Sequence, residues 1–310
     1  MTLVTVAVPS YRRPEALRSS LVAVLAQIRE LRKGDDEASF RVLVVDNDTS
    51  GSAATVAREL GADYVCEPEP GLAAVRNRAL DSAGDSRVLV FIDDDEVPGD
   101  GWLRALLEMY RRTGADAVAG RVTTALPADV DDWTRAGYLR PRRRDGQQMM
   151  AAATNNLLLD LGTVRRLGLR FDPEFGLVGG EDTMFTRQLT AGGGVIRWAE
   201  GAHVVESIGP ERLERRWILT RTFRAGNSTA LVNARLRRRG RERLAGRLSD
   251  ALGGLARIVV GAIRAVWGRA SGSPTRTALA ERSMWRGAGM LAGAVGYAYD
   301  EYRRRRSKAA

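Results

Sequence analysis

The first 110 residues alternate short apolar runs with stretches of helical periodicity, and this alternation limits the fold more than any other feature. Continuous apolar runs occupy residues 3–8, 41–45 and 88–92, and a shorter one spans 62–66. Three helices are expected between these runs: one that begins at Pro14, one over 52–60 and one over 72–83. Strands that are apolar throughout are typical of a parallel sheet covered on both faces. We therefore predict an α/β domain built on a mostly parallel sheet.

Polar residues follow these strands, at the edge of the sheet where ligands bind. They are Pro9-Ser10-Tyr11, Asp46-Asn47-Asp48 and Asp93-Asp94-Asp95-Glu96. No glycine-rich dinucleotide or phosphate loop follows the first strand. Three adjacent carboxylates repel one another unless a cation lies between them, and Mg²⁺ or Mn²⁺ takes such oxygen ligands together with phosphates. The pattern favours a site for a divalent cation and a phosphate, and a solvated acidic loop is the alternative.

The middle of the chain, residues 111–210, is less regular. Asn155 and Asn156 precede an apolar run at 157–161, and Glu181 and Asp182 open an expected helix over 183–191. A strand-like stretch at 195–199 leads to the single histidine, His203. The single cysteine, in the apolar stretch at 62–66, is expected only to pack.

The last third is strongly basic, with 23 basic and 7 acidic residues in 211–310. Residues 248–266 form an amphipathic helical pattern, with arginines opposite the apolar stripe. Two interpretations stay open for 243–310, a lid packed on the first domain and an interfacial helix on an anionic membrane. Sparse aromatic residues argue against nucleic acid. No uncharged apolar stretch reaches the roughly 18 residues of a membrane-spanning helix.

Five motifs in order resemble those of family 2 inverting glycosyltransferases: VAVPSYRR, VVDND, GLAAVRNRAL, FIDDDE and GGEDTMF. The resemblance covers about residues 3–220. It implies the GT-A fold, a Rossmann-like, mostly parallel sheet with flanking helices. Residues 1–110 would form the nucleotide-sugar half of this domain, 111–220 the acceptor half, and 221–310 a separate basic helical region.

The resemblance also implies roles for residues at the strand ends. Tyr11 would lie near the nucleotide base, Asp46 would accept a hydrogen bond from it, and Asp95 would bind the metal ion. The nucleotide-sugar set implied as a whole is Pro9, Ser10, Tyr11, Asp46, Arg76, Asp93 and Asp94. Alternatives remain open: Asp46 as a helix cap, Arg76 in a surface ion pair, and Tyr11 in simple packing.

Asp182, with Glu181 beside it, would be the general base, or the two would merely favour the start of a helix. His203 would complete the metal shell or be structural. Four further residues are acceptor candidates: Asn155, Asn156, Arg216 and Trp217. Processive relatives carry Gln or Arg three residues before an Arg-Trp pair, and this chain has Leu213 at that position. We therefore expect one sugar to be added per encounter.

The predicted function is transfer of one sugar from a nucleotide sugar, most simply a UDP-sugar, with a divalent cation. The acceptor would be a hydroxyl of a saccharide or lipid-linked saccharide, and the location cytoplasmic, at the inner face of the cell membrane. One alternative is a sugar nucleotidylyltransferase, although PSYRRPE lacks the glycines of that class. The other is a non-catalytic nucleotide-sugar-binding protein.

Overall fold

A computed structural model describes residues 2–34, 38–176, 179–237 and 240–299. The chain forms two compact units. The sheet unit comprises Met1–Ala125, Arg140–Asp172 and Asp182–Ile208. The helical unit comprises Leu126–Leu139, Pro173–Glu181 and Gly209–Ala310. The helical unit thus takes up two earlier segments and begins before residue 221, where the sequence placed its start.

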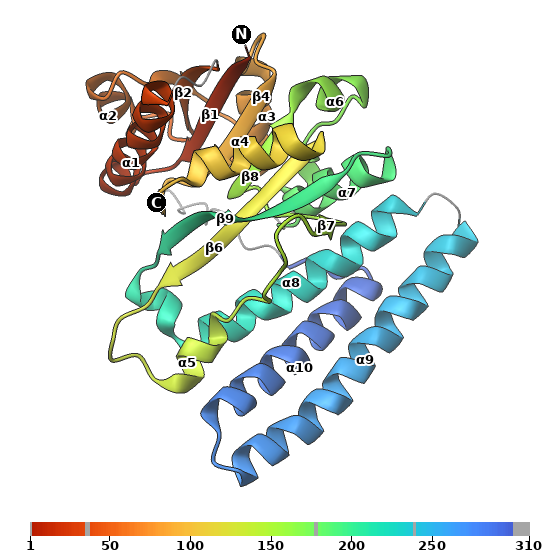
Figure 1. Cartoon of the computed structure of the whole chain (residues 1–310). Helices are drawn as coiled ribbons and strands as arrows, with labels where there is room; N and C mark the ends of the chain where they lie inside the picture. Colours follow the sequence, from red (N-terminus) through yellow and green to blue (C-terminus); the bar gives the residue numbers. More distant parts are fainter. Residues whose placement is uncertain (1, 35–37, 177–178, 238–239, 300–310) are drawn as a thin grey trace, which may run out of the picture. The chain divides into compact units, whose positions relative to one another are not determined.

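The sheet unit holds one mixed sheet in the order β3-β2-β1-β4-β8-β6-β9-β5, with β7 on β9 (Figure 1). Strands β1 to β4 are parallel, as predicted, whereas β8 runs antiparallel to both β4 and β6. The strand bounds are β1 Leu3–Ser10, β2 Ser39–Asp46, β3 Asp63–Cys66, β4 Val88–Ile92, β5 Glu96–Pro98, β6 Ala117–Ala125, β7 Gln148–Met149, β8 Asn156–Asp160 and β9 Ile196–Ser207.

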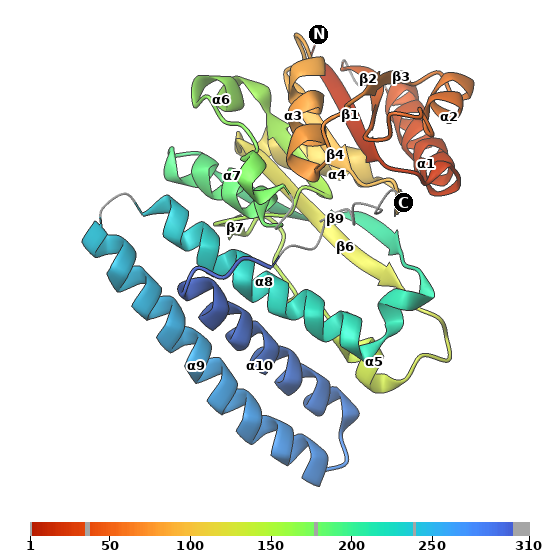
Figure 2. The same cartoon turned by 180° about the vertical axis from the view of Figure 1, so that it is seen from behind.

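Helices cover both faces of this sheet because its strands are apolar on both sides. Val4, Val6 and Val8 of β1 belong to one core, and Ala7 belongs to the other. The first core is closed by α1 (Pro14–Lys33), α2 (Ala54–Glu59) and α4 (Trp102–Thr113). The second is closed by α3 (Leu72–Ser82), α6 (Leu161–Arg166) and α7 (Glu181–Ala191). Figure 2, which is the view of Figure 1 turned by 180°, shows the helices on this second face in front of the sheet.

The helical unit consists mainly of α8 (Arg215–Leu236), α9 (Gly240–Ala270) and α10 (Pro274–Ala294), with the short α5 (Asp132–Gly137). Two short 3₁₀ segments, Pro173–Phe175 and Pro210–Leu213, also belong to it. Helix α10 packs against both α8 and α9 (Figures 1 and 2). Glycines permit this packing: a Cβ at Gly289 would lie 1.9 Å from the Phe223 carbonyl oxygen, and one at Gly226 2.0 Å from that of Arg286.

We expect Gly289→Val to destabilise the protein by about 3 kcal/mol, since the two helix backbones must separate to admit the side chain. Urea unfolding followed by circular dichroism measures this loss. Gly253→Ala is the matched control, because a Cβ there meets only ordinary contacts, the nearest at 3.4 Å. Equal stability of the two variants would contradict the close packing of α8 and α10.

Helix α9 bears on the question of a membrane span. In the described part of the chain it is the one helix long and apolar enough to cross a membrane, by length and composition alone. The sequence prediction concerned an uncharged stretch and still holds, because α9 meets a looser condition that allows up to two charged residues within the apolar stretch. Only 22% of its most apolar stretch is buried, so it is not the core helix of the unit.

Candidate active site

The loops after β1 and β4 are tied together at the carboxyl edge of the sheet. The Ser10 hydroxyl, at the end of β1, donates to Asp94 Oδ2 at 2.8 Å. The Arg13 guanidinium donates to Asp95 Oδ2 at 2.8 Å and to Asp94 Oδ1 at 3.4 Å. The structure therefore brings together the PSYRR and DDDE motifs, as the topology predicted.

Carboxylates crowd this edge. Asp94 and Glu96 are buried, and Asp93 is half-buried. Burial, with the nearby charges of Asp95, Asp94 and Glu206, raises the pKa of Asp93 to about 7, although Arg76 acts in the opposite direction. Burial likewise raises the pKa of Asp94 to about 6 and that of Glu96 well above its usual value.

Sequence analysis missed Glu206, which belongs to this cluster. It stands opposite Glu96 in the pairing of β5 with β9, and it is 8% exposed. Its carboxylate accepts hydrogen bonds from Arg140 at 2.9 Å and from Thr124 at 3.2 Å. A charged residue in an otherwise apolar strand-like stretch was the available signal, but the predicted strand ended at residue 199, seven residues before it.

The raised pKa values predict how stability depends on pH. The folded state binds protons on Asp93 and Asp94 more tightly than the unfolded chain, where an aspartate titrates near 3.9. This contribution to stability is present at low pH and is lost as the pH rises through about 6 to 7.

Without metal ions, the melting temperature should therefore fall between about pH 5 and about pH 8, and Asp93→Asn should flatten the fall. Thermal melts in EDTA measure it. Mn²⁺ should restore stability more at the higher pH, where the carboxylates are charged. A melting temperature that rises over this range would contradict the prediction.

The loop after β2 is held by buried polar groups. Asp46 is fully buried, and its carboxylate accepts from the backbone of Asp48 at 3.0 Å, from that of Ala53 at 2.9 Å and from the Tyr64 hydroxyl at 3.2 Å. Asn47 donates to the carbonyls of residues 67 and 69 and accepts from the amide of residue 71. Asp46 thus shapes the loop before α2, and its predicted bond to a base stays a prediction.

Asp48 is a second charged group of this loop. Its carboxylate lies 3.2 Å from the Arg12 guanidinium, and hydrogen bonds from Ser50 and Arg12 lower its pKa to about 2. The guanidinium carbon of Arg12 lies 5.2 Å from the centre of the half-exposed Tyr11 ring. The backbone of Arg12 has a φ of 54°, in the left-handed region. Tyr11 therefore lies at the surface, where a planar ligand can reach it.

Arg76 connects the acidic edge to α7. It is 5% exposed, and its positive charge partly opposes the rise in the pKa of Asp93. Its guanidinium carbon also lies 5.8 Å from the centre of the Phe171 ring. Phe171 stacks on Phe185 of α7, with ring centroids 4.2 Å apart. Arg76 is therefore buried, which removes the alternative of a surface ion pair.

Helix α7 presents the predicted base in its first turn. Asp182 is half-buried and accepts from the Thr183 amide at 2.5 Å, whereas Glu181 is buried at 3% exposure. Phe185 and Leu189 fix α7 in the second core of the sheet unit. The helix start predicted at residue 183 lies at Glu181, and a catalytic role for these carboxylates stays a prediction.

The remaining candidates of the sheet unit have internal partners. His203 Nε2 lies 2.6 Å from the Thr123 hydroxyl oxygen, and burial lowers its pKa. Asn155 donates to Glu96 at 2.5 Å, so it lies beside the carboxylate cluster. Asn156 is 2% exposed, donates to the carbonyls of residues 121 and 202, and accepts from Trp102 at 2.9 Å. This geometry favours a structural role for Asn156, where β6 and β9 shift register.

Two acceptor candidates belong to the helical unit. Trp217 stacks on Tyr138 with ring centroids 6.5 Å apart, and Arg212 and Arg221 stand over its ring. Arg216 is exposed. Their acceptor role remains a prediction.

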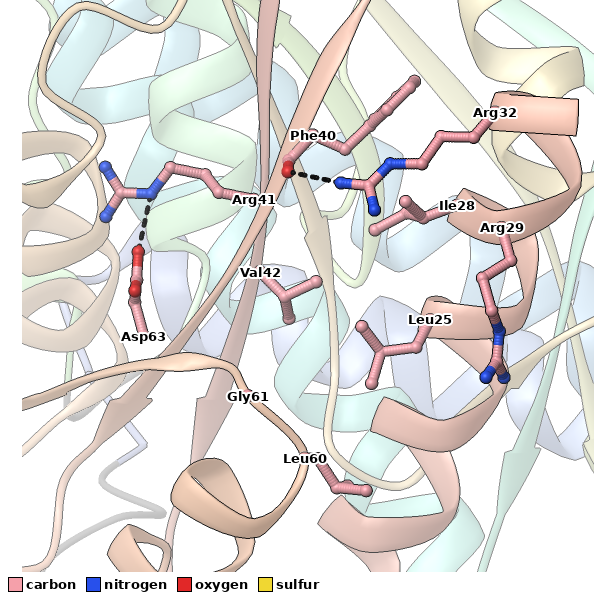
Figure 3. A pocket seen from close by; sticks show the side chains of 10 residues that line it. All are labelled: Leu25, Ile28, Arg29, Arg32, Phe40, Arg41, Val42, Leu60, Gly61 and Asp63. Carbon is pink, nitrogen blue, oxygen red and sulfur yellow. Dashed lines mark hydrogen bonds and ion pairs between the residues drawn. The ribbon is translucent and has the colours of Figure 1, made fainter.

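A surface hollow of about 410 Å³ lies elsewhere on the sheet unit (Figure 3). Its walls come from α1, the first half of β2 and the turn before β3. Arg41 pairs there with Asp63 at 3.0 Å, and Arg32 donates to the Phe40 carbonyl at 3.4 Å. None of the carboxylates after β4 lines it, so the hollow is separate from the candidate site.

Comparison with known proteins shows the family to which the chain belongs. The model of the family described as Glycosyl transferase family 2 matches residues 5–170. The succinoglycan biosynthesis protein ExoM of Rhizobium meliloti is 34% identical over 235 residues, which are 73% of this chain and 73% of ExoM. The chain belongs to glycosyl transferase family 2. This family 2 protein is therefore a glycosyltransferase, and sugar transfer is its chemistry.

More distant relatives agree. Glycosyltransferase AglE of Haloferax volcanii is 25% identical over 243 residues, covering 75% of this chain and 74% of AglE. S. aureus TarS 1–349 superposes with a TM-score of 0.56 at 12% identity, covering 91% of each chain. GalNAc-T7, solved with UDP, GalNAc and Mn²⁺, superposes with a TM-score of 0.55 at 12% identity, covering 76% of this chain and 50% of GalNAc-T7. These structures share the GT-A fold with this chain, as predicted.

The donor atoms at the acidic edge fit a hard divalent cation. Burial and mutual repulsion raise the pKa values of Asp93 and Asp94, so a nearby cation would relieve an unfavourable accumulation of charge. Within the described residues, no three His, Cys, Asp or Glu side chains are grouped to enclose a metal by themselves. The site therefore suits an ion held by one or two carboxylates and completed by phosphate and water.

Proposed function

We propose that this enzyme transfers one sugar from a UDP-sugar to a hydroxyl of a saccharide or lipid-linked saccharide, with inversion at the anomeric carbon. The observation that carries the proposal is the carboxylate cluster after β4, tied by Ser10 and Arg13 to the loop after β1. The structures of TarS with UDP-GlcNAc and of GalNAc-T7 with UDP and Mn²⁺ share this fold, and they support the choice of donor.

The nucleotide end of the donor is proposed to lie between the loops after β1 and β2. Tyr11 offers an exposed ring for the base, and Arg76 supplies buried positive charge beside Asp93. Asp95 is proposed to hold Mg²⁺ or Mn²⁺, with His203 as the second predicted ligand. When bound, such an ion stabilises negative charge on a diphosphate leaving group as a Lewis acid.

The acceptor step needs a base. The acceptor oxygen forms a bond to the anomeric carbon while the bond from that carbon to the diphosphate oxygen breaks, and the electron pair of that bond stays on the diphosphate. Attack from the face opposite the leaving group inverts the configuration. The acceptor proton passes to the carboxylate of Asp182, at the start of a helix fixed in the core. His203, Asn155 and the pair at 216–217 keep their predicted roles as untested parts of this proposal.

Calorimetric titration of UDP and GDP into the protein, with Mn²⁺ and then with EDTA, tests the donor site. We expect UDP to bind with Mn²⁺ and to lose most of its affinity in EDTA. Tight GDP binding with no UDP binding would overturn the choice of base. Binding of UDP without any turnover of a panel of UDP-sugars, with or without saccharide acceptors, would instead favour the non-catalytic binding protein.

The location proposed from the sequence, the cytoplasm at the inner face of the membrane, is consistent with a soluble nucleotide-sugar donor. Fractionation of cells that express the tagged chain tests it.

A further inference from the structure

Helix α9 packs through its smallest residues. The buried positions that it turns toward its neighbours include Gly246, Gly254, Gly261, Ala265 and Gly268. A Cβ at Gly254 would lie 2.7 Å from the Gly287 carbonyl oxygen of α10. This side of α9 therefore has no room for large apolar side chains, which must point elsewhere.

The large apolar side chains of α9 are exposed. The apolar face of α9 is defined by Leu244, Leu248, Leu252, Leu255, Val259, Ile263, Val266 and Trp267, each at least 50% exposed. At 100° per residue these positions fall opposite the packed glycines. The face runs from residue 244 to residue 267, roughly 35 Å at 1.5 Å per residue, and so covers most of the helix. An exposed strip of this kind marks an interaction surface in a soluble unit.

Exposed arginines border the packed side of the same helix. Arg247, Arg257 and Arg264 are exposed, and none of the ion pairs in the described residues includes them. The two nearest buried carboxylates are already neutralised, Asp250 by Arg237 at 3.1 Å and Glu281 by Arg269 at 2.7 Å. The positive charge of α9 thus lies on the side of the helix away from the apolar face, which is the pattern of an amphipathic helix that lies on an anionic lipid surface.

A membrane-spanning placement of α9 conflicts with its packing. Helix α10 lies along α9 and carries Glu281, Arg282 and Arg286 within its length. Arg215 of α8 and Arg269 of α9 both form ion pairs with Glu281. Carrying this charged cluster into hydrocarbon would be costly, so the packed unit is suited to lie on a bilayer and not to cross it.

We propose that the apolar face of α9 lies flat on an anionic lipid bilayer, with its side chains in the interface, and that the excess of basic residues in the C-terminal region attracts the anionic headgroups. The partner is the lipid surface itself. A second copy of the chain would also cover the apolar face, but it would bring together two C-terminal regions that each carry 23 basic and 7 acidic residues in 211–310.

Cosedimentation of the purified full chain with phosphatidylglycerol–phosphatidylcholine vesicles tests this proposal. We expect binding to these vesicles, little to phosphatidylcholine alone, and release in about 0.5 M NaCl. Leu252→Gln with Val259→Gln should weaken binding at least about tenfold, since two apolar side chains no longer enter the interface. Met150→Gln, at a 70%-exposed apolar position of the sheet unit, is the matched control and should bind normally.

Other outcomes would overturn the proposal. Equal binding to neutral and anionic vesicles would remove the role of the arginines, and unchanged binding by the double variant would remove that of the apolar face. A protein that binds no vesicles but changes from dimer to monomer in the double variant, by analytical ultracentrifugation, would show that a second copy covers α9. Resistance to alkaline carbonate extraction would indicate a spanning helix. UDP binding, measured in parallel, separates these outcomes from failure of the donor site.

Discussion

Asp95→Ala should reduce sugar transfer by about three orders of magnitude and abolish the Mn²⁺-dependent part of UDP binding. In the structure Asp95 is half-buried beside Asp94, and the exposed Arg13 guanidinium lies 2.8 Å from its carboxylate. Removing the carboxylate leaves the growing charge of the leaving diphosphate without its metal. Initial rates with a UDP-sugar and calorimetric titration of UDP, each with Mn²⁺ and with EDTA, measure both effects.

Asp100→Ala is the matched control for this variant. Asp100 lies five residues further along the chain and is exposed, so its loss should leave the rate and the affinity for UDP unchanged. A variant at residue 95 that keeps Mn²⁺-dependent UDP binding and normal turnover would refute the metal assignment. It would move attention to the carboxylates of Asp93, Glu96 and Glu206.

Asp182→Asn should lower kcat by roughly 10²- to 10⁴-fold, because an amide cannot accept the proton of the acceptor hydroxyl. The affinity for UDP should stay within about twofold, since Asp182 is proposed to act on the acceptor and not on the nucleotide. The fold should survive, because the amide oxygen can still accept from the Thr183 amide. Steady-state rates over a range of pH, with UDP titrations alongside, separate the two quantities.

Asp132→Asn controls for the loss of a charge in the first turn of a helix. Asp132 is exposed at the start of α5, and its replacement should leave kcat unchanged. If Asp182→Asn retains full activity, the base lies elsewhere, and Glu181→Gln becomes the next variant to measure. If it loses UDP binding as well, Asp182 shapes the donor site and the proposed division of roles fails.

Sequence analysis predicted the nucleotide half of the sheet because its signals are local. The apolar run at 88–92 coincides with β4, and the helix expected from Pro14 begins at Pro14. Parallel pairing then follows from strand order, so Ser10 and Asp94 could be expected at one edge before any contact was known. The contact between them is found at 2.8 Å.

The second half was harder to predict because its pairing is non-local. Strand β6 was not expected, and β9 continues to Ser207, eight residues past the apolar stretch that marked it. The buried residues of β9 alternate with exposed or polar ones, and the register between β9 and β6 shifts at Gly120 of β6. Glu206 therefore reaches the carboxylate cluster by sheet topology, which a scan of neighbouring residues cannot detect.

The basic helices were interpreted correctly in part. The amphipathic pattern at 248–266 is confirmed as part of α9, and the helical extension is present. Within the helical unit the apolar stripe of α9 is exposed, and its packing as a lid on the first domain stays a prediction. The periodicity identifies two sides of a helix, but only the glycine contacts to α10 show which side is packed.

The helical unit is assembled from three separate stretches of the chain, Leu126–Leu139, Pro173–Glu181 and the segment from Gly209 onward. Trp133 and Ala136 from the first stretch are buried with Ile218 and Ala278 from the last. This unit therefore cannot be exchanged between relatives as a terminal cassette. A recombination event near residue 208 would separate partners that fold together, so the two units are constrained to diverge as one gene.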